Sequence, residues 1–138
     1  MQKIEYIIIG NELLNGKISD RNTHSLAKSL SKFGLSLDRV HIVADDELAF
    51  GACLKEAMGR ANIIITSGGL GPTKDDLTKM MLAKFFNKNI EFSQKAFDLA
   101  QLHYQRGKRE FDQEKIDYQN IPRDFFPILN PIGYAPGL

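Results

Sequence analysis

Three short runs of β-branched residues shape the first half of the chain, and each is followed by a loop and a helical pattern. They cover residues 4–9, 37–43 and 62–66. A run that is apolar on both faces suits a parallel strand covered on both sides, and the first run suits a central strand. Strands that alternate with helices are joined by right-handed crossovers. The sequence therefore predicts an α/β fold with a mostly parallel sheet.

Apolar residues recur at helical spacing after each run. Asp20 is placed to cap a helix that ends near Gly34. Further helices are predicted over 47–60, 76–86 and 93–105, with apolar positions that include Phe50, Leu54, Ala57, Met58, Leu77, Met80, Met81 and Leu82. The polar stretch 109–119 is expected to continue helically. Residues 125–129 are expected to form an edge strand, because Pro127 interrupts them.

Composition limits the classes of protein that the chain can belong to. Apolar residues make up 43% of 138 residues, which suffices for one core, so we expect one domain over 1–138 that is truncated or disordered at its C-terminal end. The net charge of +1 argues against nucleic-acid coating and polybasic membrane binding. The single Cys53 fits a reducing compartment, and no apolar stretch approaches the roughly 20 residues of a membrane span. We expect a cytoplasmic protein.

A glycine-rich loop follows the third run. Gly68, Gly69 and Gly71 stand just before a predicted helix, where backbone N–H groups can hold a phosphate. The loop is neither a P-loop nor a dinucleotide fingerprint, because it lacks Gly-Lys-Ser/Thr and has Lys74 in place of a third fingerprint glycine. A tight strand-to-helix turn explains the glycines equally well.

Carboxylates follow all three runs, at the edge where an open parallel sheet binds ligands. The residues concerned are Glu12, Asp20, Asp45, Asp46, Asp75 and Asp76. Clustered oxygens suit a divalent cation, which could bridge phosphate oxygens and activate water. Helix capping by Asp45 and Asp76 is the alternative. His24, His41 and His103 share no ligand spacing, and Lys108 or Arg109 could reach a phosphate from a solvated segment.

Four blocks of sequence together resemble a known family. Residues 10–22 (GNELLNGKISDRN), 43–46 (VADD), 66–78 (TSGGLGPTKDDLT) and 130–137 (NPIGYAPG) are similar to the N-terminal domain of the competence/damage-inducible protein CinA. The wider fold family is the molybdopterin-binding domain of MogA, MoaB and MoeA. The resemblance implies a three-layer α/β/α sandwich whose glycine and acidic loops form a pocket for a phosphorylated ligand.

The resemblance also implies an activity, which is hydrolysis of the pyrophosphate of ADP-ribose or a related nucleotide with Mg, Mn or Co. Asp45 and Asp76 would be catalytic, and Asp45, Asp46, Asp75 and Asp76 would hold the metal. The nucleotide-like ligand would be bound by Gly10, Asn11, Glu12, Asn22, Ser67, Gly68, Gly69, Leu70, Gly71, Thr73 and Tyr134.

Two other functions stay open at this point. One is a molybdopterin-binding module of molybdenum cofactor biosynthesis, and the other is a non-catalytic domain that senses a nucleotide. Leu70 stands where molybdopterin-type loops commonly have threonine, which counts against a pterin. Tyr134 replaces a smaller residue, so its ring could stack on a base or narrow the pocket. Relatives of this fold form dimers or trimers, so we expect a homo-oligomer without a nucleic-acid or membrane partner.

Overall fold

The structure is a computed structural model that describes residues 2–138. The chain forms two compact units, Met1–Gly68 and Gly69–Leu138, called here the N-terminal and the C-terminal unit. That the two make one domain stays a prediction.

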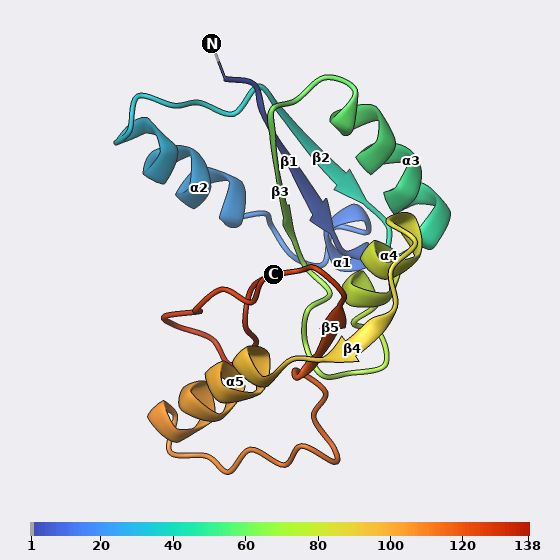
Figure 1. Cartoon of the computed structure of the whole chain (residues 1–138). Helices are drawn as coiled ribbons and strands as arrows, with labels where there is room; N and C mark the ends of the chain where they lie inside the picture. The colour runs from blue at the N-terminus through green and yellow to red at the C-terminus, as the bar shows by residue number, and fades with distance from the viewer. Residues whose placement is uncertain (1) are drawn as a thin grey trace. The chain divides into compact units, whose positions relative to one another are not determined.

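The N-terminal unit is built on a parallel sheet of three strands (Figure 1). Strand β1 (Ile4–Ile9) lies between β2 (Arg39–Val43) and β3 (Ile63–Ser67), and it pairs with both in parallel. All six residues of β1 are buried, which confirms the predicted central strand. The expectation that 62–66 is a buried strand is wrong, because β3 is at the edge of this sheet and its Ile63 is exposed.

Helices cover the sheet of the N-terminal unit. Helix α3 (Glu47–Met58) packs against β1 and β2 and buries Phe50. Figure 1 shows α2 (Asn22–Ser31) on the other side of the sheet, and α1 (Asn11–Leu14) is a single turn that follows β1. The predicted α/β class with a parallel sheet between helices is confirmed. Met58 is half exposed rather than buried, because it lies in the last turn of α3.

A carboxylate is buried in the central strand of this sheet. Glu5 is 2% exposed, and its two carboxylate oxygens accept hydrogen bonds from Arg60, Nε to Oε1 at 3.0 Å and Nη2 to Oε2 at 3.1 Å. His41 Nε2 lies 2.8 Å from Oε2. The Arg60 bonds hold the pKa of Glu5 below its ordinary value, against the effect of burial. This ion-pair cluster joins β1, β2 and the end of α3.

The C-terminal unit combines two helices with a short antiparallel pair of strands. Its elements are α4 (Thr78–Phe85), β4 (Ile90–Phe92), α5 (Gln94–Arg106) and β5 (Asn120–Pro122), and β4 pairs with β5. Helix α5 matches its prediction, and Ser93 caps it by accepting from Ala96 N–H. The sequence did not indicate β4 and β5, because three residues are too few to show a strand period.

Two predictions in the C-terminal unit are wrong. Residues 109–119 form turns and irregular structure instead of a helix, since their polar side chains offer no continuous apolar face. Residues 125–129 form no strand, and only an isolated bridge joins Ile128 to Gly137. Pro127 and the turn residues after 129 prevent a longer ladder.

The C-terminal unit has an aromatic core that holds its last loop. Ala100, Tyr104 and Tyr118 are buried there, with Phe111 and Tyr134 packed against them. His103 is fully buried beside this cluster. Its Nδ1 donates to the carbonyl oxygen of Tyr134 at 2.9 Å, and its Nε2 accepts from Asn130 N–H at 3.3 Å. A neutral histidine with the proton on Nδ1 therefore ties α5 to segment 130–134.

Removing this tie is expected to destabilise the C-terminal unit. His103→Ala should lower the free energy of unfolding by about 2 to 4 kcal/mol, because it leaves a cavity and two unpaired backbone groups. Urea unfolding followed by circular dichroism measures the loss. His24→Ala is the control, since His24 is exposed and should change stability by less than about 0.5 kcal/mol. Equal effects of the two substitutions would contradict the assigned contacts.

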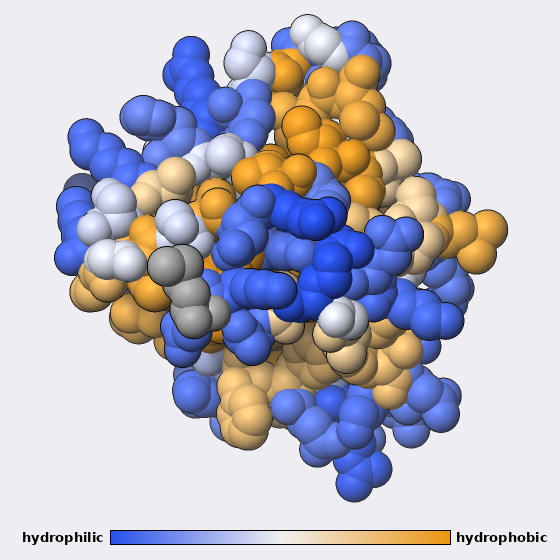
Figure 2. Space-filling model, turned by 90° about the horizontal axis from the view of Figure 1, so that it is seen from above, coloured by the Kyte–Doolittle hydropathy of each residue, from blue (hydrophilic) through white to orange (hydrophobic). Residues whose placement is uncertain are grey.

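Apolar side chains also reach the surface. Figure 2 shows hydrophobic areas beside hydrophilic ones in one view of the surface. The most exposed large apolar residues are Phe33, Leu48, Phe126 and Ile132, each at least 77% exposed. Among the described residues, no helix is long and apolar enough to cross a membrane. The homo-oligomer and the cytoplasmic location stay predictions.

Candidate functional site

The ends of β1 and β2 are joined by a reciprocal pair of hydrogen bonds. Asn11 N–H donates to Asp45 Oδ2 at 2.8 Å, and Asp45 N–H donates to Asn11 Oδ1 at 3.3 Å. Parallel strands end at the same edge, so two loops that are distant in sequence meet here. The predicted neighbourhood of Asn11 and Asp45 is thus present in the N-terminal unit.

Asp46 is the N-cap residue of α3 in this unit. Its Oδ1 accepts from Ala49 N–H at 2.8 Å and caps α3. Capping, which was the alternative considered for Asp45, therefore belongs to the next residue. Asp45 keeps Oδ1 without a hydrogen-bond partner among residues 2–138.

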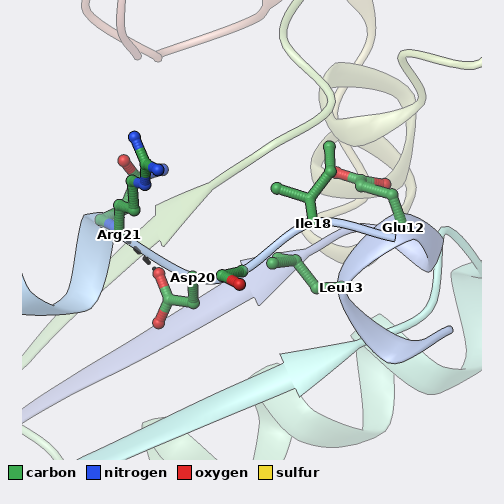
Figure 3. A pocket seen from close by; sticks show the side chains of 7 residues that line it. Glu12, Leu13, Ile18, Asp20 and Arg21 are labelled. Atoms are coloured by element: carbon green, nitrogen blue, oxygen red, sulfur yellow. Dashed lines mark hydrogen bonds between the residues drawn. The ribbon is translucent and has the colours of Figure 1, made fainter. Parts of the chain in front are cut away.

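A pocket of about 390 Å³ lies in the segment that runs from α1 to the start of α2 (Figure 3). It is lined by Glu12, Leu13, Ile18, Ser19, Asp20, Arg21 and Asn22. Asp20 Oδ1 accepts from Asn22 N–H at 2.9 Å and Thr23 N–H at 3.0 Å, so Asp20 caps the first turn of α2 as predicted. Hydrogen bonds from Thr23 and Asn22 hold the pKa of Asp20 below its ordinary value. In Figure 3 the Asp20 carboxylate and the Arg21 side chain point in opposite directions.

Glu12 folds back over the end of β1. A Cβ at Gly10 would lie 2.6 Å from its Oε1, so a larger residue at this position would make the Glu12 carboxylate shift. Ser67, at the end of β3, pairs its hydroxyl with that of Tyr6 at 2.5 Å. Burial raises the pKa of Tyr6. Gly68 has φ +100°, and a Cβ there would fall on the Ile9 carbonyl.

The glycine loop continues in the C-terminal unit, where Gly69 and Gly71 pack closely against the side chains of Thr78 and Asp76. Gly69 has φ +64°, and a Cβ there would collide with the Thr78 side chain. A Cβ at Gly71 would lie 2.5 Å from Oδ2 of Asp76. Tight packing within the chain therefore explains both glycines, as a close strand-to-helix turn requires.

Thr73 and Asp76 bind each other. Thr73 donates its backbone N–H at 2.9 Å and its hydroxyl at 2.6 Å, both to Asp76 Oδ2. Asp76 therefore does not cap α4, for which no side-chain cap is present. Its Oδ1 has no hydrogen-bond partner among residues 2–138. The structure thus fixes one oxygen of Asp76 and leaves the other available.

A cavity of about 130 Å³ lies next to this pair within the C-terminal unit. Its lining comes from the loop, from α4, from the first residues of β4 and β5, and from the segment before β5: Gly71, Pro72, Thr73, Asp76, Lys79, Met80, Ile90, Asp117 and Asn120. Lys79, Asp117 and Asn120 were not predicted as site residues. No sequence signal distinguishes Lys79 from other helix lysines. Asp117 lies in the stretch 109–119 that was predicted as helix, and Asn120 directly follows that stretch.

The remaining predicted residues lie in different surroundings. Tyr134 packs its ring at 4.7 Å from that of Tyr104, and Arg109 lies 5.2 Å above it. Both are contacts within the C-terminal unit and stabilise its core. Leu70 is half buried, whereas Asp75 is exposed. A shared site of Asp45 and Asp76 would join residues of different units and stays a prediction.

The described residues contain no group of three His, Cys, Asp or Glu side chains that could hold a metal ion. The predicted cation would have to be held by carboxylates that also have other contacts, such as Asp45 with Asn11 and Asp76 with Thr73. Neither unit offers a complete ligand set in its described part.

The N-terminal unit thus has a parallel α/β fold with carboxylates at strand ends, and the C-terminal unit holds most of the glycine loop. Residues 5–138 match the family described as "Probable molybdopterin binding domain". The chain is 33% identical over 137 residues to a CinA-like protein of Flavobacterium psychrophilum, covering 99% of this chain and 33% of that protein. It is 36% identical to a protein of Caldivirga maquilingensis, of which it covers 51%. The chain thus spans between a third and about a half of these relatives.

Solved structures agree with this assignment. The CinA protein of Thermoplasma acidophilum superposes with a TM-score of 0.83 at 29% identity, over 99% of this chain and 79% of that one. MoaB of Pyrococcus furiosus, titled a tungsten cofactor synthesizing protein, shares the fold with a TM-score of 0.58 at 24% identity, over 77% of this chain and 64% of that one. This chain belongs to the molybdopterin-binding domain family and is a CinA-type N-terminal domain of it.

Proposed function

We propose that this domain binds a phosphorylated small molecule of the molybdopterin type at its glycine loop. The observation that carries the proposal is the cavity of about 130 Å³, which is lined by residues of the loop and by Asp76. Membership in a family described as molybdopterin-binding supports it, as does the likeness to MoaB. These similarities favour the molybdopterin-type ligand over the nucleotide hydrolysis that the CinA resemblance implied.

The lining of the cavity suits one end of such a ligand. Asp76 Oδ1 can accept a hydrogen bond from a ligand N–H or O–H group. Met80 and Ile90 offer apolar surface for a flat ring. The volume is that of a single ring or a phosphate group, so the rest of a larger ligand would extend beyond the cavity.

Asp76→Asn tests the proposal. We expect about tenfold or greater loss of affinity for molybdopterin, because an amide cannot replace the charged acceptor. Fluorescence titration of the purified domain under anaerobic conditions measures the dissociation constant. Asp98→Asn, on the exposed face of α5, is the control and should leave the affinity within twofold. Failure of the wild-type domain to bind molybdopterin would refute the proposal.

The second candidate is metal-dependent hydrolysis of ADP-ribose at its pyrophosphate. One observation favours it: Asp45, Glu12 and Asp20 are all carboxylates of the loops that follow β1 and β2. A divalent ion would supply charge neutralisation and an activated water. Among the described residues, neither unit presents a group of three side chains that could hold this ion, so its ligands would include groups that already have other contacts.

A direct assay decides on this second candidate. The domain is incubated with ADP-ribose and Mg, Mn or Co, and AMP is quantified by chromatography. If the domain is a hydrolase, AMP forms, and Asp45→Asn abolishes turnover while the circular dichroism spectrum is kept. Absence of AMP with all three metals from a folded domain would exclude the reaction.

A further inference from the structure

Lys79 is a sheltered cation in the cavity beside the glycine loop. Its side chain is 14% exposed, although it belongs to the first turn of α4. Its ammonium donates to the carbonyl oxygens of Asp117 at 2.5 Å and Asn120 at 2.8 Å. These bonds hold the turn before β5 against α4. The cavity wall on this side therefore depends on one lysine.

The ammonium has a donor to spare. It carries three N–H groups, and the two carbonyls use two of them. Asp117 Oδ2 forms an ion pair with the ammonium at 3.8 Å, which is beyond hydrogen-bond distance, so this carboxylate does not use the third N–H group. Burial lowers the pKa of Lys79, which shows that its charge is poorly solvated. A sheltered charge of this kind is less screened by salt than one at the surface.

The other charged groups of the cavity already have partners. Asp76 Oδ2 is bound twice by Thr73, and Asp117 Oδ1 accepts from the backbone and side-chain N–H groups of Asn120 at 3.2 and 2.8 Å. Asp117 is also more than half exposed, so water screens its charge. Thr73, which the family resemblance implied as a phosphate ligand, uses both of its donors on Asp76. Lys79 is the one cation in the described lining of this cavity.

We propose that Lys79, rather than Thr73, receives the phosphate group of the ligand at the glycine loop. The third N–H of its ammonium donates to a phosphate oxygen, and the loop backbone around Gly71 adds further donors. This inference rests on the proposed function, because it assigns the anionic part of that ligand to a residue.

The test is a titration with inorganic phosphate, monitored on the backbone amides of the isotope-labelled chain. We expect Lys79→Met to weaken phosphate binding about tenfold or more, and Lys79→Arg to stay within about threefold, because both cations donate to phosphate. Lys74→Met removes an exposed cation of the same loop and is the matched control, with a change below twofold. The same four proteins are then titrated with molybdopterin.

If Lys79→Met disturbs the cavity wall, phosphate affinity measured as a function of pH on the wild-type chain and on Lys79→Arg still tests the role of Lys79. Between about pH 8 and pH 10 phosphate keeps its charge, whereas a lysine with a lowered pKa loses its proton as pH rises. Wild-type affinity should fall across this window, and Lys79→Arg should remove the fall. Asp76, Asp117 and Tyr118 are the other titratable groups near the cavity, and Tyr118 stays neutral across this window because burial raises its pKa.

The outcomes separate the two proposals. Phosphate and molybdopterin binding that survives unchanged in folded Lys79→Met, with no fall in affinity across the pH window, would overturn the role of Lys79 and leave the proposed function standing. A wild-type chain that binds neither compound would overturn the proposed function and the role of Lys79 with it.

Discussion

Gly68→Ala is expected to lower the free energy of unfolding by about 3 to 5 kcal/mol. Two costs add in this substitution. The residue has φ +100°, where an L side chain is strained, and its Cβ would fall on the carbonyl group of Ile9 in the buried central strand. A backbone carbonyl cannot move aside as a flexible side chain can, so β1 and β3 would have to separate locally. Denaturant unfolding of the wild-type and variant chains measures the loss.

Gly16→Ala provides the matched control. Gly16 also has positive φ, at +76°, but nothing lies within 4 Å of a Cβ built there. Gly16→Ala should therefore lower the free energy of unfolding only by the conformational strain, about 1 to 2 kcal/mol. If both substitutions cost the same, the close approach of Gly68 to Ile9 contributes nothing, and the reason given for this glycine is wrong.

Glu5→Gln is expected to cost about 3 kcal/mol at neutral pH. The substitution leaves the Arg60 guanidinium without its charged partner and weakens the contact with His41, in a strand that is otherwise fully buried. Glu56→Gln removes the other carboxylate that contacts Arg60. Because Glu56 is 71% exposed, this control should change stability by less than about 0.5 kcal/mol.

The effect of Glu5 should depend on pH in a definite direction. Its pKa is lowered in the folded chain from an ordinary value of 4.5. The charged carboxylate therefore stabilises the fold fully above about that pH, and the contribution is lost as pH falls through the lowered folded value. The stability difference between wild type and Glu5→Gln should narrow in this acidic window. The titratable or charged groups that interact with this carboxylate are His41, Arg60 and Cys53, and Glu56 contacts Arg60 from the other side. A difference that stays constant down to pH 3 would contradict the pairing.

The candidate site was predicted from the sequence in part. The closeness of Asn11 and Asp45 could be predicted, because the loops that follow neighbouring parallel strands meet at the same edge of the sheet. The role of Thr73 does not follow from such a rule. A threonine in a glycine loop can donate to a phosphate or to a nearby carboxylate, and only the position of Asp76 decides between them.

Lys79 illustrates a different limit of sequence reasoning. Its spacing in α4 is that of any exposed helix lysine, and its burial depends on a turn that returns 38 residues later. The strands β4 and β5 that bring this turn back have only three residues each, so they leave no periodic signal. The prediction of a helix over 109–119 failed because the sequence of this polar stretch does not show where the chain turns.

The sequence by itself determined the alternation of strands and helices, the central position of β1 and the family of the domain. These properties depend on local apolar periodicity and on ordered motifs, which are written along the chain. Only the tertiary structure decided which partner each polar group takes: Glu5 with Arg60, Thr73 with Asp76, and Lys79 with the carbonyls of Asp117 and Asn120. A buried polar group must find a hydrogen-bond partner, and that partner is set by packing between segments that are distant in sequence.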